Sequence, residues 1–435
     1  MIGRRAALAF AVVAASCTAT TVTSVPPGSP VAVPSVGAGG AATARRAIAE
    51  LCVSPDLGEP ELVSPGDLPS QIQELIVQVE AARGLSFVTP PAAEAITDQE
   101  MDRKLEESFD IYYPEDLYDR RTVAWRTIGV IPRDADLFES YRAYLTGQVI
   151  GFYDPQTGEL VYLGEGEDLG LAERMVLSHE LTHALDDQRF DLKRLDRLAA
   201  RCADERFTAA LGLVEGSAQH FSTQVIINDP DLDLSELADV VASAGDAQEA
   251  LRAVPPFVQA LQAWPYVTGQ AFVDAIARDG GTAAVDAAML QPPVSTEQVI
   301  HPERYPADVP VRVDVADLAG PLGRGWGDLD AMEVGELWLK EMLDLRLPPI
   351  ASANAAAGWD GGVYRAFTDG EDVVVVLHTA WDSDADAQDF VVAMSDWTGA
   401  AAGSHVSVTF ADGGVRSVFA TDESSLAAAR AALSV

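Results

Sequence analysis

The stretch LAERMVLSHELTHALDDQRF, residues 171–190, carries the most informative pattern in this chain of 435 residues. Its apolar residues recur at three- and four-residue spacing without proline or glycine, which predicts one helix over Leu171–Phe190. His179 and His183 stand one turn apart on this helix and share a face, with Glu180 beside the first histidine. Two such imidazoles can bind one Zn²⁺ while the carboxylate takes a proton from water. The alternative is a pair of ordinary polar histidines.

A catalytic zinc site needs a third protein ligand and leaves its fourth position open to water. The metzincin continuation of the motif would place glycine at position 186 and histidine at position 189, where this chain has Asp186 and Arg189. Glu215 is the best remaining candidate, because a carboxylate within the apolar stretch Leu211–Gln219 is costly to bury without a cation. The sequence therefore predicts a distant glutamate as third ligand.

Small residues around Glu215 predict that its helix approaches the HELTH helix closely. They are Gly212, Gly216 and Ala218. The alternative for Glu215 is a surface carboxylate on an amphipathic helix. Asp204 and Glu205 rank lower as ligands, because acids at the start of a helix commonly serve as caps. His220 lies roughly 140° around the helix from Glu215, so we expect it to pack or hydrogen-bond nearby.

A hydrolytic metal site also needs a donor for the oxyanion that develops on the substrate carbonyl. The irregular stretch Pro292–Tyr305 is dense in polar and aromatic groups. Within it, His301 and Tyr305 are the candidates for this catalytic role, with Tyr266 behind them. For each residue the alternative is a structural role in packing a loop.

These residues resemble the gluzincins, the metallopeptidases that combine HExxH with a distant glutamate. They resemble more closely a group of largely uncharacterised bacterial extracytoplasmic metallopeptidases. The resemblance extends from about Leu117 to Trp397. The segments that carry it are Gln148–Pro155, His179–Gln188 with Phe190 and Asp191, Leu213–Gly216, Pro265–Tyr266, Pro292–Gln298 and His301–Tyr305. It implies a zincin-like catalytic domain but no particular substrate.

The resemblance further implies one zinc ion bound by His179, His183 and Glu215, with Glu180 as the catalytic base. The best-studied gluzincins have an acid four residues after the ligand glutamate, and this chain has Gln219 there. A carboxylate that supports a ligand histidine must then come from elsewhere. Two acids on the metal helix are candidates: Asp186 and Asp187.

The charge balance argues against several classes of partner. The chain has 29 basic and 67 acidic residues, for a net charge of −38, which disfavours nucleic acid and anionic membrane surfaces as partners. A hydrophobic content of 48% and a charged content of 22% are ordinary for a folded protein of two or three domains.

The N-terminus has the pattern of an export signal. Arg4 and Arg5 precede a short apolar core over Ala6–Ala15. Ala-Ala-Ser-Cys, ending at Cys17, resembles a bacterial lipobox, in which the cysteine is lipidated after cleavage. We therefore expect residues 1–17 to be a signal peptide with lipobox and the mature protein to be an extracytoplasmic lipoprotein of the cell envelope. It would be secreted if Cys17 is not lipidated.

Residues 18–43 are uncharged until their end and rich in Thr, Val, Pro, Gly, Ser and Ala, which predicts a flexible tether. No further apolar stretch is long enough to predict a transmembrane helix. If Cys17 carries lipid, Cys52 and Cys202 remain, and an exported protein permits a disulfide between them. Two unpaired buried thiols are the alternative.

The expected fold class is α+β. Residues 44–350 are expected to form the mainly helical zincin-like domain. Alternating runs at Gln148–Asp154 and Glu159–Leu163 predict a hairpin with an edge strand just before the metal helix. Such an edge can bind an extended peptide as an additional strand. The equally favoured alternative is a hairpin that only covers the hydrophobic core. The last helix of this domain is expected over Ala331–Leu343.

Residues 351–435 predict a small antiparallel unit in the order ββαββα. Its predicted elements are strands at Val363–Phe367, Val373–Thr379, Val406–Phe410 and Val415–Ala420, with helices at Asp384–Trp397 and Ser424–Leu433. No constellation of catalytic residues occurs in it, so we expect it to pack against the core or to bind a partner.

Together these patterns predict an exported, membrane-anchored zinc-dependent peptidase that acts on a peptide or protein. In this interpretation Glu180 activates water and passes the proton to the leaving amine. The alternative is a non-catalytic binding or scaffold lipoprotein of the envelope that retains the peptidase fold. A purely structural zinc site is less favoured, because such sites usually close with cysteine and none lies near HELTH.

Overall fold

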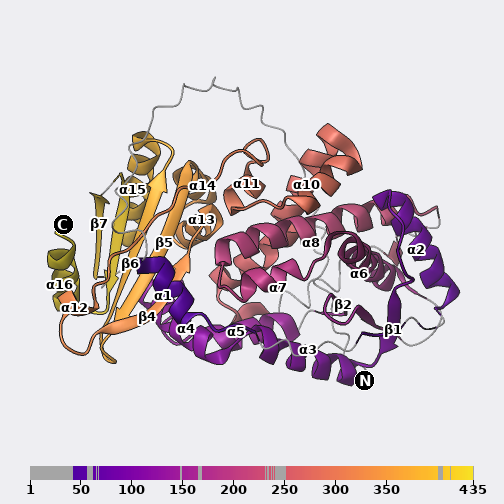
Figure 1. The fold of residues 1–435 in the computed structure, drawn as a ribbon, viewed down its shortest axis with the longest axis horizontal. Helices are drawn as coiled ribbons and strands as arrows, with labels where there is room; N and C mark the ends of the chain where they lie inside the picture. Colours follow the sequence, from indigo (N-terminus) through magenta and orange to yellow (C-terminus); the bar gives the residue numbers. More distant parts are fainter. Residues whose placement is uncertain are drawn as a thin grey trace.

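The computed structural model describes residues 43–55, 62–64, 66, 68–146, 149–164, 169–230, 232, 235–236, 238, 240, 251–399, 405–411 and 413–434. Figure 1 shows a helical region with a small sheet beside a larger, helix-covered sheet. The predicted α+β class is therefore confirmed. The predicted signal peptide with Cys17 lies outside the described residues, and so does the predicted tether except Thr43.

Helices dominate the first two thirds of the described chain. They are α1 (Thr43–Leu51), α2 (Ser70–Arg83), α3 (Asp98–Tyr112), α4 (Glu115–Ile128), α5 (Leu137–Thr146), α6 (Leu171–Phe190), α7 (Arg194–Ala199), α8 (Asp204–Ile227), the 3₁₀ turn η1 (Leu251–Ala253), α10 (Pro256–Leu290) and α11 (Thr296–Ile300). No helix in the described part of the chain combines the length and apolarity needed to cross a membrane.

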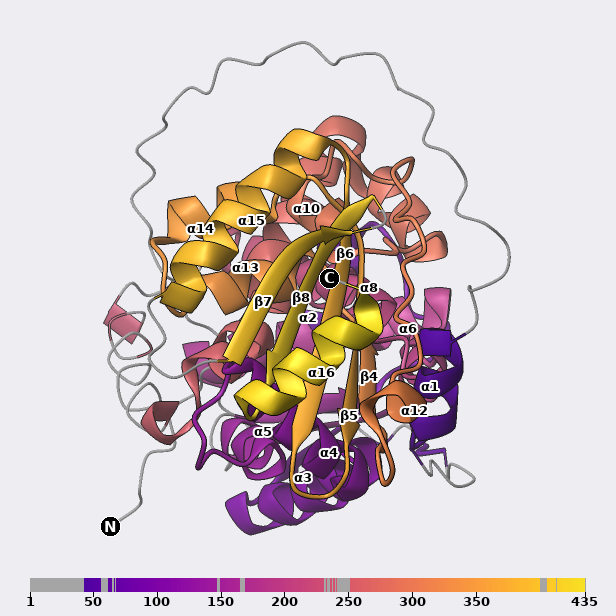
Figure 2. The same cartoon turned by 90° about the vertical axis from the view of Figure 1, so that its left-hand side faces the viewer.

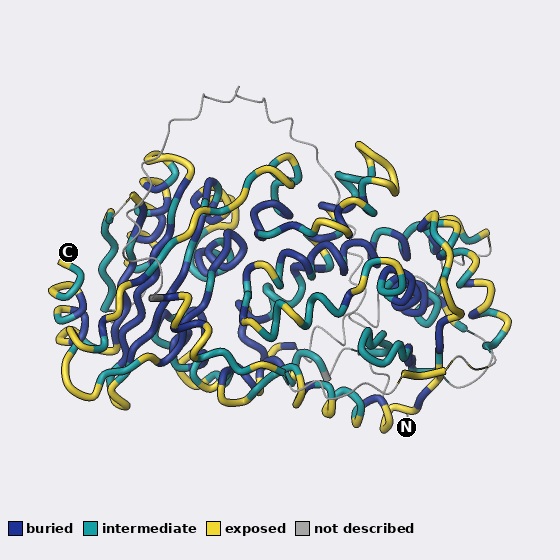
Figure 3. Tube along the Cα trace, viewed as in Figure 1, coloured by how far each residue is buried: buried dark blue, intermediate teal, exposed yellow. Residues whose placement is uncertain are grey.

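Helix α6 coincides with the predicted helix from its first residue to its last. It starts after Gly170 and ends at Asp191, whose left-handed backbone (φ 58°) stops the helix. Most of its residues are buried, as the dark colour of α6 in Figure 3 shows.

The predicted hairpin is also confirmed. Strands β2 (Gly151–Asp154) and β3 (Glu159–Leu163) pair antiparallel. A strand that the sequence did not indicate, β1 (Ala92–Ile96), pairs parallel to β3, so the sheet has the order β1-β3-β2 and β2 is an edge. A Cβ on Gly151 would lie 2.7 Å from Val176 Cγ1, so glycine lets β2 lie directly against α6.

The C-terminal unit has the predicted ββαββα order, preceded by one more strand. Its strands are β4 (Gly327–Glu333), β5 (Trp359–Thr368), β6 (Val373–Trp381), β7 (His405–Ala411) and β8 (Gly414–Ala420), all antiparallel in the order β4-β5-β6-β8-β7. Its helices are α12 (Ala319–Leu322), α13 (Glu336–Asp344), α14 (Pro349–Ala356), α15 (Asp384–Gly399) and α16 (Glu423–Leu433).

Two expectations about this unit are wrong in part. The predicted helix over Ala331–Leu343 is a strand up to Glu333 and a helix only from Glu336. Because β4 pairs with β5, the sheet begins before the boundary expected at residue 350. The sequence did not indicate a strand here because β4 has four consecutive buried residues. Residues on both faces of the sheet are therefore covered, and the polar–apolar alternation of a strand is lost.

Both faces of the large sheet are covered. Figure 2 shows α15 and α16 lying across it, and the buried side chains place α4, α13 and α15 on one face and α1, α12 and α16 on the other. The first of these layers is continuous with the helical region, since Trp125 and Phe257 share its core with Tyr364 and Phe419. The two regions therefore share one hydrophobic cluster, whereas α6 and α8 pack in further clusters of the helical region.

The structure joins Cys52 to Cys202 by a disulfide across a sequence separation of 150 residues. The first cysteine follows α1 and the second precedes α8. The bond therefore fastens the N-terminal helix, which packs on the large sheet, to the start of the helix that carries Glu215.

Candidate metal centre

Three predicted ligands converge between α6 and α8. His179 Nε2 lies 3.0 Å from His183 Nε2 and 3.1 Å from Glu215 Oε2, and His183 Nε2 lies 3.3 Å from the same oxygen. The side chains are between 4% and 14% exposed. We call His179, His183 and Glu215 the triad.

The triad has the dimensions of a zinc site. Nitrogen and oxygen donors held about 2.0–2.1 Å from a tetrahedral zinc ion lie about 3.3 Å from one another. The three distances in the triad are 3.0, 3.1 and 3.3 Å. The donor set, two imidazoles and one carboxylate, is also one of the sets that catalytic zinc sites use. The residues present therefore fit a zinc ion with one position left open.

Glu180 lies next to the triad and is buried. Burial raises the pKa of its carboxyl group, while the two neighbouring imidazoles and the backbone N–H of Tyr153 favour the charged form. Because Tyr153 belongs to β2, the edge strand and the glutamate of the motif meet at one place. The arrangement can move a proton beside an ion held by the triad.

Helix α8 packs against α6 as predicted, with the Ser217 hydroxyl bonded to Asp186, but the closest contact of its glycines is made with α10. A Cβ on Gly216 would lie 2.2 Å from Gly269 O, and one on Gly269 would lie 2.0 Å from Gly212 O. The glycines therefore let α8 and α10 touch backbone to backbone. The glycines of the sequence indicated a close helix contact but did not identify α10 as the partner. A glycine allows close approach by the backbone of any neighbouring helix.

This contact brings Tyr266 of α10 to the triad. Its ring stacks on that of His179 with the centroids 6.1 Å apart. The negative charge of Glu215, together with burial, raises the pKa of Tyr266, so its hydroxyl keeps its proton and can donate a hydrogen bond. Among the three candidates for stabilising an oxyanion, Tyr266 is the one that lies at the triad.

The structure does not bring His301 and Tyr305 to the triad. Nε2 of His301 lies 3.0 Å from Oε1 of the buried Glu336, and the Tyr305 hydroxyl donates to the carbonyl oxygen of Gln291 at 2.6 Å. The Tyr305 ring packs edge-on against Phe272. Within the described residues no hydrogen bond, ion pair or ring contact links either one to the triad. Both hold the loop around α11.

The two acids proposed to support a ligand histidine make other bonds. Asp186 accepts hydrogen bonds from Arg83 Nε at 2.8 Å and from the Ser217 hydroxyl at 2.7 Å. Asp187 accepts one from the Tyr153 hydroxyl at 2.8 Å. The first acid thus ties α2, α6 and α8 together beneath the triad, and the second ties α6 to β2. No sequence pattern singled out Arg83, which is fully buried.

His220, on the same helix as Glu215, bonds elsewhere, as expected. Its Nδ1 lies 2.5 Å from Asp274 Oδ1 and its Nε2 lies 2.7 Å from the Gln224 amide nitrogen.

Electrostatics within the triad favour a protonated His183 beside a charged Glu215. Burial lowers the pKa of His183, but the carboxylates of Glu215, Glu180 and Asp186 together outweigh burial and raise it to about 9. Burial raises the pKa of Glu215, but the two imidazoles outweigh burial and hold it well below its usual range. A metal ion bound here would replace the proton on His183.

A second group of carboxylates has a similar spacing but already encloses a cation. One oxygen each of Glu297, Asp308 and Asp382 lies within 4.8 Å of the others. Arg304 Nη1 lies 2.6, 3.0 and 2.6 Å from them, in that order. We call these four residues the Arg304 cluster. Its guanidinium takes the place that an ion would take.

Comparison with known proteins reaches only the C-terminal part. Residues 322–431 match a family described as a domain of unknown function (DUF8575). The match starts just before β4 and ends within α16, so it covers the large sheet. No curated protein and no solved structure matches the chain.

Proposed function

We propose that this chain is a zinc-dependent peptidase with a zincin-like catalytic region, in which the triad holds the ion. The observation that carries the proposal is the convergence of His179, His183 and Glu215 at 3.0–3.3 Å from one another, with Glu180 beside them. The resemblance of the sequence to gluzincins supports the same assignment.

In this proposal the chain's own groups divide the work. A zinc ion bound by the triad would act as a Lewis acid toward a carbonyl and lower the pKa of water. Glu180 accepts a proton from water and donates it to the leaving amine. Tyr266, which keeps its proton, donates a hydrogen bond to the oxyanion.

The edge strand β2 supports a peptide as the substrate. Leu163 N–H donates to Ile150 O at 2.8 Å, so alternation along the antiparallel pair turns the backbone groups of Gly151 and Tyr153 away from β3, where Tyr153 N–H bonds to the Glu180 carboxylate. An extended peptide that pairs with this edge becomes another strand of the sheet. Because Tyr153 N–H also faces Glu180, one bond of that peptide would lie beside the base.

We also propose that the protein acts outside the cytoplasm, anchored by lipid at Cys17. The disulfide Cys52–Cys202 supports an oxidising compartment. Mass spectrometry of the protein from membranes, with a Cys17→Ser variant as control, tests the anchor. A wild-type N-terminus without lipid contradicts it.

Metal analysis followed by cleavage profiling tests the enzymatic proposal. We expect about one zinc per chain and cleavage of a peptide library that stops with a chelator and returns with zinc. Zinc without cleavage of any peptide contradicts catalysis and favours the envelope scaffold. Cleavage that a chelator leaves unchanged contradicts the metal mechanism.

A further inference from the structure

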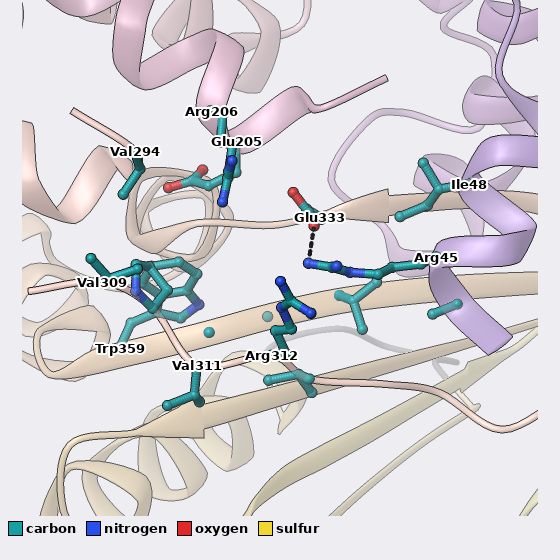
Figure 4. Close-up of a pocket in the computed structure, with 16 residues that line it drawn as sticks. Arg45, Ile48, Glu205, Arg206, Val294, Val309, Val311, Arg312, Glu333 and Trp359 are labelled. Atoms are coloured by element: carbon teal, nitrogen blue, oxygen red, sulfur yellow. Dashed lines mark ion pairs between the residues drawn. The ribbon is translucent and has the colours of Figure 1, made fainter. Parts of the chain in front are cut away.

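A cavity of about 150 Å³ lies where α1, the start of α8 and β5 meet the segment 309–313. Figure 4 shows residues of all four segments pointing into it. Glu205 on its wall precedes Glu215 by ten residues of α8, or about 15 Å along the helix. The cavity is therefore separate from the triad.

Arginines gather at this cavity. Arg45, Arg206 and Arg312 line it, and Arg201 lines an adjoining cavity together with all three. Within the described residues the one ion pair of this group joins Arg45 to Glu333 at 4.0 Å, and the other three have no ion pair. In a chain with 67 acidic and 29 basic residues, four arginines beside two lining acids, Glu205 and Glu333, of which only Glu333 forms an ion pair with them, indicate an anionic ligand.

The opposite wall of the cavity is apolar. Val309 and Val311 line it although they are 58% and 49% exposed, together with the buried Trp359. A Cβ on Gly361 would lie 2.4 Å from Val311 O, so glycine lets the valine segment lie on β5. The exposed valines present an aliphatic surface next to the guanidinium groups.

A buried donor also lies in this wall. Trp359 is 2% exposed, and its indole Nε1 has no hydrogen-bond partner among the described residues. This nitrogen lies 2.9 Å from the place a Cβ on Gly362 would take, and both residues line the cavity. A buried N–H without an acceptor is uncommon, which sets this side of the cavity apart from an ordinary packed core.

We propose that this cavity binds the free C-terminal carboxylate of a peptide whose last residue is aliphatic. Guanidinium groups pair with a carboxylate through two parallel hydrogen bonds. The valines and the Trp359 ring receive the side chain. A cavity near 150 Å³ accepts a group of about the size of benzene, which suits one aliphatic side chain.

Titration calorimetry of the full chain with N-acetyl-leucine tests this proposal. N-acetyl-leucinamide lacks the carboxylate and N-acetylglycine lacks the side chain, and we expect each to bind at least tenfold more weakly. Inorganic phosphate serves as a fourth probe. The proposal is overturned if N-acetyl-leucine does not bind, if the amide binds equally well, or if phosphate binds more tightly.

Variants locate the site. Arg206→Gln and Arg312→Gln should each raise the Kd for N-acetyl-leucine at least tenfold. Arg46→Gln is the matched control, because Arg46 neighbours Arg45 in the chain but pairs with Glu50 at 2.7 Å and does not line the cavity. Equal affinity in all three variants places binding elsewhere and overturns the proposal. Glu215→Ala should leave the Kd unchanged, which separates this site from the metal centre.

Discussion

The triad and the Arg304 cluster each bring three possible ligand atoms together, but the two groups differ in what lies among those atoms. In each, three ligand atoms lie within 4.8 Å of one another. In the Arg304 cluster a guanidinium nitrogen lies among the carboxylates at 2.6–3.0 Å. In the triad the atoms that approach are the ligand atoms themselves, at 3.0–3.3 Å. The Arg304 cluster contains a permanent cation, and we propose that the triad binds a metal ion.

The difference shows how a structural group of acids can be told from a metal site. Several carboxylates can share one arginine because its planar fork offers five donors. Two imidazoles and one carboxylate instead offer lone pairs toward a common point, which a zinc ion satisfies. Spacing alone does not separate the two clusters, but the kind of positive group does, because a guanidinium keeps its charge whereas an imidazole can exchange its proton for a metal ion.

The largest expected effect concerns the base beside the triad. Glu180→Gln should lower kcat by about 10²–10⁴-fold, the usual contribution of a general base, while zinc content stays near that of wild type. Peptide cleavage and metal analysis of the same preparation measure both quantities. Glu173→Gln, two turns earlier on α6, is the matched control. A wild-type kcat in Glu180→Gln would contradict the assignment of Glu180 as the general base beside the triad.

Removal of a ligand should separate the two clusters by their metal affinity. Glu215→Ala should weaken zinc binding by more than about 100-fold, because loss of a ligand exceeds the effect of losing its supporting partner. Asp382→Ala in the Arg304 cluster should leave zinc binding unchanged. Competition with a fluorescent chelator gives both affinities, and equal zinc binding in Glu215→Ala contradicts the ligand assignment.

The metal-free protein should lose stability as the pH rises. The pKa of His183 is about 9 when folded, above its unfolded value near 6.5, so its protonated form stabilises the fold. This contribution is complete below about pH 6.5 and disappears as the pH passes 9, with a change of up to about 3 kcal/mol.

Denaturant unfolding of chelator-treated protein at pH 6 and pH 9.5 measures this change. The variant His183→Asn should reduce the difference between the two pH values. Zinc should reverse the trend, because the imidazole must lose its proton to bind the ion. If the free energy of unfolding of His183→Asn depends on pH in the same way as that of the wild type, groups other than His183 cause the dependence.

The Arg304 cluster should depend on its guanidinium for stability. Arg304→Met leaves Glu297, which is 1% exposed, without its charged partner and should lower the free energy of unfolding by about 2 kcal/mol. Arg312→Met, which breaks no ion pair, is the control. If calcium restores the stability of Arg304→Met, a metal ion can replace the guanidinium among these carboxylates. The triad and the Arg304 cluster would then differ only in the cation that each holds.

The smallest expected effect tests the residue that stacks on His179. Tyr266→Phe should lower kcat by about tenfold with little change in KM, since the lost hydrogen bond forms mainly in the transition state. Tyr305→Phe, whose hydroxyl bonds to Gln291, should leave kcat unchanged. A lower kcat in Tyr305→Phe than in Tyr266→Phe would instead assign the stabilisation of the oxyanion to the loop around α11.

Local patterns were sufficient for elements whose signal lies within a few residues. Helix α6 and the β2–β3 hairpin follow from periodicity and turn residues, and both occur where expected. Strand β1 was missed because its parallel partner lies far along the chain and its burial does not alternate. The end of strand β4, Ala331–Glu333, was taken for the start of a helix because four consecutive residues of the strand are buried, which removes the alternation that marks a strand.

For the candidate site, the sequence by itself determined which side chains project from one face of α6, because helical geometry relates His179 to His183 over four residues. It also indicated Glu215, since a carboxylate in an apolar helix needs a partner. Only the tertiary structure decided that α10 brings Tyr266 to this triad while His301 bonds to Glu336. Such choices depend on contacts between helices distant in sequence, where glycines set how closely backbones approach, and no local pattern specifies the neighbour.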